Sequence, residues 1–179
     1  LFEARRPKDA SIVAEIDGTV EYVGVTRGMR KFVITGESAG GPGGVVPHQE
    51  ALIPQGRHVY VQNGSVVRAG DRLTEGPINP HDILKIKGIE EVQEYLVNEI
   101  QEVYRLQGVR IDDKHIEVIV RQMLQKVKID DPGNTAYLEG ENVDRLMVLE
   151  ENEKMANEGP QPATFLPLVL GITKASLST

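Results

Sequence analysis

The sequence predicts an α+β fold, in which a small, twisted antiparallel β module of barrel or sandwich type precedes a helical hairpin and a third helix. Three observations indicate this order. Short alternating apolar runs with Asp-Gly and Asn-Gly turns fill the first part of the chain. A segment with two prolines, GPINPHD, then interrupts the pattern, and from Gly88 onward apolar residues recur at helical spacing.

The first strands are expected within residues 11–35. Apolar residues alternate with polar ones from Ile12 to Ile16, and Asp17-Gly18 is a turn signal. Arg27-Gly28 then predicts a hairpin, because glycine adopts the positive φ angles that tight hairpin turns require.

Residues Gly36–Glu50 hold five glycines and two prolines, which predict a flexible loop. The loop lacks the GxxxxGK[ST] order of a phosphate-binding loop. Its letters GESAG, Gly36 to Gly40, fit G-x-S-x-G, the pattern around a nucleophilic serine. No strand-to-helix turn is expected there and no Asp–His order follows convincingly, so we interpret the match as a coincidence of composition.

Residues 51–76 resume the strand pattern. Val59 and Val61 alternate with polar neighbours, and Asn63-Gly64 is a strong hairpin signal.

Two helices joined by the segment LQGVRIDD should form a hairpin. Gly108 is expected as the left-handed C-terminal cap of the first helix, and Asp112 or Asp113 as the N-cap of the second. The apolar face of the first helix comprises Ile89, Val92, Leu96, Ile100 and Val103. That of the second comprises Ile116, Ile119, Val120, Met123 and Val127. Its exposed face would carry Lys114, Glu117, Arg121, Gln125 and Lys128, a mixed-sign set unlike a DNA-reading helix.

A third, acidic helix is expected at roughly Glu141 to Asn157. Its candidates for burial are Val143, Leu146, Met147 and Val148. Three prolines after it predict an extended connector leading to the segment LGITKASLST.

Composition limits the classes of function. The 179 residues carry a net charge of -7, and the segment from Asp130 to Glu158 alone carries -7, with nine acids against two bases. This balance argues against a free-standing nucleic-acid binder.

The absence of cysteine excludes disulfides, thiolate zinc sites and cysteine nucleophiles. The scarcity of aromatic residues, 4% with no Trp, argues against base-stacking platforms. No apolar run reaches membrane-spanning length and no signal peptide is visible, so we expect a soluble, cytoplasmic protein without a membrane partner.

Local basic clusters remain candidates for DNA contacts within this acidic chain. One comprises Arg5, Arg6 and Lys8, and the other comprises Arg27, Arg30 and Lys31. The alternative interpretation of both clusters is ordinary solvated surface charge.

A metal site is not expected. His115 and Glu117 form H-x-E, which opens the zinc-deaminase signature, but the P-C-x-x-C half needs cysteines. The two residues also lie about 200° apart around a helix axis, so they do not converge on one ion. The nearby Asp112 and Asp113 have the simpler role of capping the helix.

The β segments also resemble biotinyl and lipoyl carrier domains, in EIDGTVEYV and VQNGSVVRAGDRL. A carrier would present a modifiable lysine on a tight hairpin, and Lys31, after Met29, is the nearest candidate. A carrier-like β domain with a helical appendage is therefore the alternative function.

A more specific resemblance covers the whole chain. LFEARRPK, GPINPHDILKIKGIEEVQEYLV, NEIQEVYRLQGVRIDDKHIEVIVRQML and LGITKASLST resemble the C-terminal part of the beta-prime subunits of bacterial DNA-directed RNA polymerases. The likeness is weakest in the glycine-rich loop and in the acidic stretch after Lys128. The chain ends, without an initial methionine, are expected for a piece of a longer subunit.

The resemblance implies an organisation in four parts. Residues 1–8 would end the second trigger-loop helix, 9–77 would form the jaw beside downstream DNA, 78–160 would form a helical region, and 161–179 would lead into the switch region. Lys174 would lie near the DNA backbone. The partners implied are duplex DNA and the beta, alpha, omega and sigma subunits. Nucleotidyl transfer, with its Mg²⁺ and Zn²⁺ sites, would belong to the rest of the enzyme, so no cofactor is expected in this piece.

Overall fold

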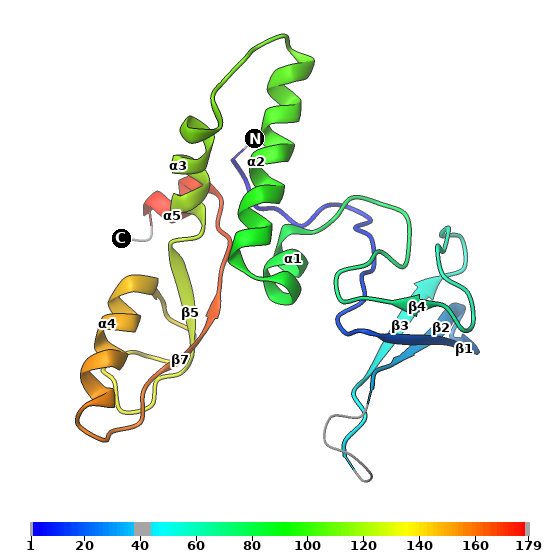
Figure 1. Cartoon of the computed structure of the whole chain (residues 1–179), viewed down its shortest axis with the longest axis horizontal. Coiled ribbons are helices and arrows are strands. Elements are labelled where there is room, and N and C mark those ends of the chain that lie inside the picture. Colours follow the sequence, from blue (N-terminus) through cyan, green and yellow to red (C-terminus); the bar gives the residue numbers. More distant parts are fainter. Residues whose placement is uncertain (1, 38–43, 178–179) are drawn as a thin grey trace. The chain divides into compact units, whose positions relative to one another are not determined.

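The computed structural model describes residues 2–37 and 44–177. The chain divides into two compact units (Figure 1). Arg6–Lys87 is called the β unit, and Leu1–Arg5 together with Gly88–Thr179 is called the helical unit. The α+β prediction is confirmed, since strands and helices are segregated along much of the chain.

The β unit contains one antiparallel sheet among its described residues, in the order β3-β2-β1-β4. The strands are β1 (Gly18–Thr26), β2 (Met29–Thr35), β3 (His48–Pro54) and the short β4 (Val66–Val67). The predicted hairpin at Arg27-Gly28 is confirmed, with φ angles of 51° and 77° and Thr26 paired with Met29. The predicted loop ends earlier than expected, because β3 already begins at His48.

Alternation along the strands builds the core of the β unit. Val20 pairs with Ile34 across the β1–β2 ladder, and both side chains are buried. The cluster consists of Ala14, Val20, Phe32, Ile34, Ala51, Ile53, Val67 and Leu73. Burial of a side chain such as Ile34 or Ile53 contributes about 1.5–3 kcal/mol, so these alternating positions supply much of the stability of the sheet.

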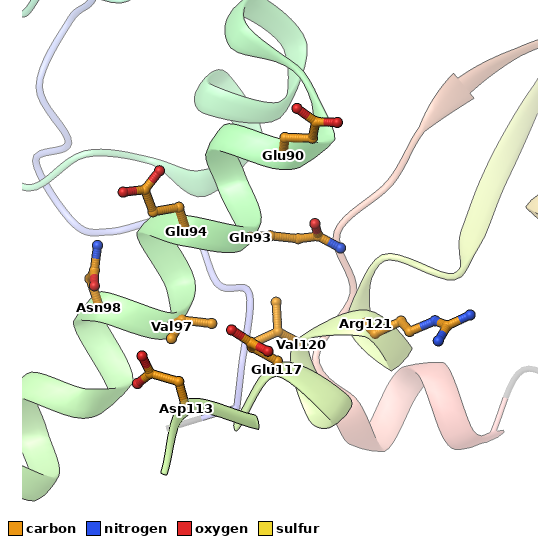
Figure 2. Close-up of a pocket in the computed structure, with 9 residues that line it drawn as sticks. All are labelled: Glu90, Gln93, Glu94, Val97, Asn98, Asp113, Glu117, Val120 and Arg121. Atoms are coloured by element: carbon orange, nitrogen blue, oxygen red, sulfur yellow. The ribbon is translucent and has the colours of Figure 1, made fainter. Parts of the chain in front are cut away.

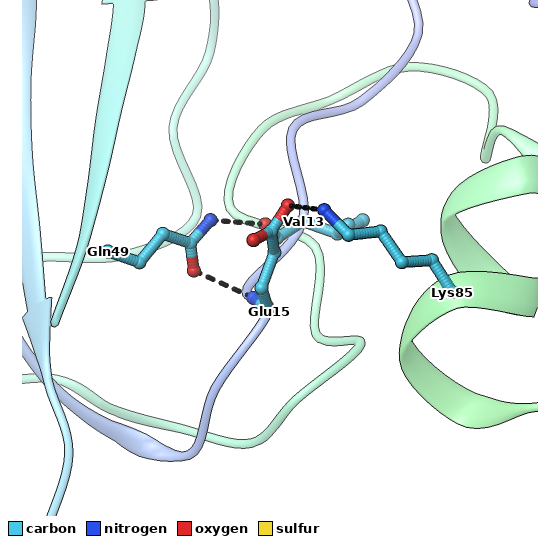
Figure 3. A network of polar contacts seen from close by, with 4 residues as sticks. All are labelled: Val13, Glu15, Gln49 and Lys85. Atoms are coloured by element: carbon cyan, nitrogen blue, oxygen red, sulfur yellow. Dashed lines mark hydrogen bonds and ion pairs between the residues drawn. The ribbon is translucent and has the colours of Figure 1, made fainter. Parts of the chain in front are cut away.

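Residues 11–16 were expected to form a strand, but they form only an isolated bridge, between Val13 and Arg72. The Gln49 side chain makes hydrogen bonds here to backbone groups that a neighbouring strand would pair in a sheet (Figure 3). The Gln49 amide accepts a hydrogen bond from the Glu15 N–H at 2.7 Å and donates one to the Val13 carbonyl at 3.1 Å. At Asn63-Gly64 the predicted turn is present, but it does not join a hairpin. The strand after it, β4, pairs with β1 and not with the residues before the turn.

Helix α1 (Pro80–Lys87) belongs to the β unit and was not predicted, because two prolines were interpreted only as breakers. Asn79 Oδ1 accepts the His81 N–H at 3.1 Å, and Pro80 occupies the first helical position, where a missing N–H costs nothing. Lys85 pairs with Glu15 at 3.0 Å, which connects the helix to residues 11–16 (Figure 3).

The helical unit begins with the predicted hairpin of α2 (Ile89–Leu106) and α3 (Asp113–Met123). Both caps are as predicted. Gly108 has a φ angle of 73°, and Asp112 accepts the Lys114 N–H at 3.1 Å. The buried faces comprise Val92, Leu96, Val97 and Ile100 of α2 and Ile116, Val120 and Met123 of α3. The buried Gln101 amide donates to the Ile111 carbonyl and to Asp113 Oδ1, both at 2.7 Å, and so fastens the connecting loop.

The second helix was predicted too long. It ends at Met123, and Val127 lies in β5 (Lys126–Asp131) together with Lys128. This strand is the centre of a second antiparallel sheet, in the order β6-β5-β7, which the sequence analysis missed. Its partners are β6 (Asn142–Asp144) and β7 (Thr164–Pro167).

The third helix, α4 (Arg145–Ala156), starts four residues later than expected, because Asp144 is its N-cap. Of its candidates for burial, Val148 is fully buried, whereas Leu146 and Met147 are exposed. Val148 packs with Val127, Ile129 and Ala163 against the second sheet.

The final segment is not a simple extended connector. It contains β7 and the short helix α5 (Ile172–Leu177). The Ile172 N–H donates to the Phe2 carbonyl at 2.9 Å, so the first described residues lie against the start of α5.

Candidate nucleic-acid interface

The two units differ in charge. The β unit holds ten basic and nine acidic residues, for a net charge of +1, whereas the helical unit holds ten basic and eighteen acidic residues, for a net charge of -8. Since DNA phosphates repel carboxylates, the β unit is the more favourable surface for DNA.

The basic residues predicted from sequence are divided between the units. Arg5 and Lys174 lie in the helical unit, and the other five lie in the β unit. Arg5 is exposed and pairs with Glu3 at 2.9 Å, which partly neutralises its charge. Lys174 lies exposed on α5. Arg6 and Lys8 are exposed near the start of the β unit, outside any strand or helix.

Arg27, Arg30 and Lys31 are close in sequence but differ in environment. Arg27 is exposed at the tip of the β1–β2 hairpin. Arg30 is only partly exposed. It donates from its guanidinium to the Arg57 carbonyl, and its Nε is buried without a partner within the described part of the chain. Lys31 forms an ion pair with Glu50 at 2.9 Å. Of these three, Arg27 is the residue whose charge is most available to a ligand.

The Lys31–Glu50 pair also bears on the carrier alternative. The hydrogen bond and charge of Lys31 lower the pKa of the Glu50 carboxyl from its ordinary value of 4.5. Lys31 lies inside β2, opposite Leu52 of β3, and the residue at the hairpin tip is Arg27. A carrier lysine would stand at the tip, so the geometry does not favour this alternative.

A groove lies between α2 and α3 in the helical unit (Figure 2). The carboxylates of Glu90, Glu94, Asp113 and Glu117 line it, with Arg121 at one end. Its negative charge makes it unsuitable for a DNA backbone.

His115 and Glu117 are both exposed on α3. Among residues 2–37 and 44–177, no group of three or more His, Cys, Asp or Glu side chains could hold a metal ion. The GESAG match extends into residues 38–40, outside the described part of the chain.

Sequence reasoning missed the residues that organise one surface of the β unit. Arg57 donates to the Ala10 carbonyl at 3.0 Å, the Asp9 carbonyl at 2.5 Å and the Glu75 carbonyl at 2.9 Å. It therefore fixes the start of the unit to the segment around Glu75. No local pattern announces this role, because the three carbonyls lie 18 to 48 residues away in sequence.

Next to Arg57, three exposed side chains gather into a cluster, here called the aromatic–arginine cluster: His58, Tyr60 and Arg72. The ring centroids of His58 and Tyr60 are 5.4 Å apart in an edge-to-face arrangement. The Arg72 guanidinium carbon lies 5.9 Å from the centroid of the Tyr60 ring. The signal in the sequence was the HVY spacing, which places His58 and Tyr60 on the same face of an extended segment.

Comparison with known proteins establishes the family. Residues 29–179 match the family model of RNA polymerase Rpb1, domain 5, and the chain belongs to this family. Over all 179 residues it is 56% identical to the DNA-directed RNA polymerase subunit beta' of Thermodesulfovibrio yellowstonii. The corresponding identities are 55% for Bdellovibrio bacteriovorus and 52% for Nitrosococcus oceani. The chain spans 12% of the length of each of these relatives.

No helix in the described part of the chain is both long and apolar enough to cross a membrane.

Proposed function

We propose that this chain is part of the beta' subunit of a bacterial DNA-directed RNA polymerase, where it guides downstream duplex DNA and contributes to subunit assembly. The observation that carries this proposal is the 56% identity to such a subunit over all 179 residues.

The proposal assigns different tasks to the parts of the chain. Residues 1–8 end the trigger-loop helix, 9–77 form the jaw, 78–160 form a helical support, and 161–179 lead into the switch region. The jaw assignment is supported by the net charge of +1 on the β unit, compared with -8 on the helical unit. The basic residues that approach DNA are Arg5, Arg6, Lys8, Arg27, Arg30, Lys31 and Lys174. Among Arg27, Arg30 and Lys31 we expect Arg27 to contribute most, because it is exposed at a hairpin tip.

Activity belongs to the assembled enzyme in this proposal. The chain acts in the cytoplasm with the beta, alpha, omega and sigma subunits, and nucleotidyl transfer occurs with the Mg²⁺ held by the rest of the beta' subunit. The isolated chain synthesises no RNA and binds duplex DNA weakly, with binding lost by physiological salt.

A segment exchange tests the proposal. The matching segment of the Bdellovibrio bacteriovorus beta' subunit is replaced by this chain, and the chimera is expressed with the other subunits of that polymerase. We expect a complex that purifies intact and synthesises RNA from a linear duplex template, because 55% identity over the whole segment preserves its core and its contacts.

The control replaces the same segment with a flexible glycine–serine linker of equal length, which should give no active complex. If the linker supports RNA synthesis as well as this chain does, the segment has no role in the enzyme. If the chimera fails to assemble although the chain within it is folded, the proposal is wrong.

A further inference from the structure

We propose that the aromatic–arginine cluster, His58, Tyr60 and Arg72, binds the phosphodiester backbone of duplex DNA. This inference rests on the proposed function and adds a contact that the basic clusters of the sequence did not include. The cluster is accessible, it is held in a fixed arrangement, and its polar groups are of the kinds that bind phosphate.

The cluster is accessible to a large ligand. All three side chains are exposed, and Tyr60 retains 53% of its surface. Within residues 2–37 and 44–177, Arg72 forms no ion pair with a carboxylate, unlike Arg5 and Lys31. Its hydrogen bond to the Gly76 carbonyl, at 3.4 Å, is long and uses a single N–H. Most of the guanidinium donors therefore remain free for a phosphate.

The backbone beneath the cluster is well fixed. The Tyr60 N–H donates to the Leu73 carbonyl at 2.9 Å, and the Glu75 N–H donates to the His58 carbonyl at 3.1 Å. Leu73 is fully buried in the core of the β unit. The Arg57 guanidinium also donates to the Glu75 carbonyl, in the second of these two paired segments. The two segments that carry the cluster are therefore held in register by hydrogen bonds and by a buried anchor.

The side chains also restrict one another. The Arg72 guanidinium lies close enough to the Tyr60 ring, at 5.9 Å, for a cation–π interaction, and His58 packs edge-to-face against the same ring. An arginine oriented in advance loses less conformational entropy when it binds, and its planar fork matches two phosphate oxygens. The Tyr hydroxyl and the His ring N–H supply further donors of the kinds that contact DNA phosphates.

One group opposes phosphate binding. The Glu75 carboxylate accepts the His58 N–H at 3.4 Å, so it places a negative charge beside the cluster. This charge predicts weak, salt-dependent binding, which suits a surface along which DNA must move.

The first experiment uses the 179-residue chain and a 20-base-pair duplex DNA at low salt, followed by NMR. We expect the largest amide shifts at His58, Tyr60 and the residues around Arg72. Arg72→Gln should weaken binding and lower the slope of log affinity against log salt by about 0.9, the loss of one phosphate contact. Arg68→Gln is the matched control, because Arg68 is exposed in the same unit but has no aromatic partner among the described residues.

Three further variants test the arrangement of the cluster. Tyr60→Phe keeps the ring that orients Arg72 and should retain most of the affinity, whereas Tyr60→Leu should lose nearly as much as Arg72→Gln. Glu75→Gln should strengthen binding, because it removes the opposing charge. Equal losses for Arg72→Gln and Arg68→Gln would show that only overall charge matters and would overturn the inference.

The second experiment separates this inference from the proposed function. The chimeric polymerase is stalled on two templates, one with a long downstream duplex and one cut close to the active centre. Arg72→Gln should shorten the lifetime of the complex on the long template only, and Arg68→Gln should shorten it on neither. A chimera that synthesises RNA but shows no effect of Arg72→Gln refutes the cluster alone, whereas an inactive parent chimera refutes the proposed function and leaves the NMR result to decide on the cluster.

Discussion

The β unit and the helical unit use the same number of basic residues, ten each, in different ways. In the β unit, Arg57 and Arg30 donate to backbone carbonyls and are only partly exposed, whereas Arg27 and Arg72 are exposed, and Arg72 forms a single long bond to the Gly76 carbonyl. In the helical unit, eighteen acidic residues outnumber the ten basic ones. Three of the basic residues, Arg5, Arg105 and Lys154, pair with nearby glutamates. The number of basic residues is therefore a poor guide to a DNA surface, because their partners decide how much positive charge reaches the solvent.

The units also differ in how they are held together. The β unit depends on one sheet and on side chains, such as Gln49 and Arg57, that form hydrogen bonds with backbone groups outside the sheet. The helical unit depends on apolar packing between α2 and α3 and on a small sheet covered by α4. Substitutions in one unit should therefore act locally, which gives four ways to test the comparison.

The largest effect is expected from the two cores. Ile34→Ala should destabilise the β unit by about 2–5 kcal/mol, because it leaves a cavity at a fully buried position. Val120→Ala in α3 is its counterpart in the helical unit. Amide hydrogen exchange should increase mainly within the unit that carries the substitution. If either substitution raised exchange equally in both units, they would unfold as one cooperative block.

A smaller effect is expected at Gln101, whose buried amide fastens the α2–α3 loop. Gln101→Leu should cost about 1–3 kcal/mol in the helical unit, because the Ile111 carbonyl and Asp113 lose their donor. Urea denaturation monitored by α-helical circular dichroism measures the change. Gln122→Leu, at an exposed position on α3, is the control and should be nearly neutral. A similar cost for both variants would contradict the role of the buried amide.

The helix caps should contribute less. Asp112→Ala should cost about 1 kcal/mol, because the Lys114 N–H loses its acceptor, and Asp112→Asn should restore most of the loss. Asp144→Ala should cost more than Asp112→Ala, since Asp144 also accepts from the Gln125 amide at 2.5 Å. Thermal unfolding of the four proteins, parent included, orders them. An Asp112→Asn variant as unstable as Asp112→Ala would exclude capping as the cause.

Features specified by neighbouring residues could be predicted from the sequence. The Arg27-Gly28 hairpin, the Gly108 cap and the Asp112 cap each follow from one or two residues in a restricted backbone conformation. The α2–α3 hairpin follows from the 3.6-residue repeat of its apolar face. Helix α1 was also encoded locally, in an asparagine N-cap followed by proline, and the prolines were misinterpreted.

Other features depend on residues far apart in sequence. Val127 satisfies the helical repeat from Met123, but the alternation with Lys126 and Lys128 suits β5 equally well, and pairing with β6 and β7 decides between them. The aromatic–arginine cluster brings residues 58–60 and residue 72 together. Backbone hydrogen bonds between residues 58–60 and 73–75 hold them there, and no local sequence pattern specifies this pairing. Basic residues could be selected from the sequence, but the partners that occupy Arg30 and Lys31 could not.

The smallest effect is expected from the Lys31–Glu50 pair. Because Lys31 lowers the pKa of Glu50 in the folded chain, this carboxylate stabilises the fold above its ordinary pKa of 4.5, and the contribution disappears as the pH falls through the lowered value. Lys31→Met should return the Glu50 pKa toward 4.5, and Lys31→Arg should keep it low. Side-chain carboxyl NMR titration measures both. The effect on stability should be slight, since Glu50 is exposed, Lys31 is partly exposed and salt screens the pair. The same substitution tests whether Lys31 contacts DNA or only Glu50. If Lys31→Met weakens DNA binding as much as Arg27→Met does, the ion pair opens when DNA binds. The distinction between paired and available cations in the β unit then no longer holds.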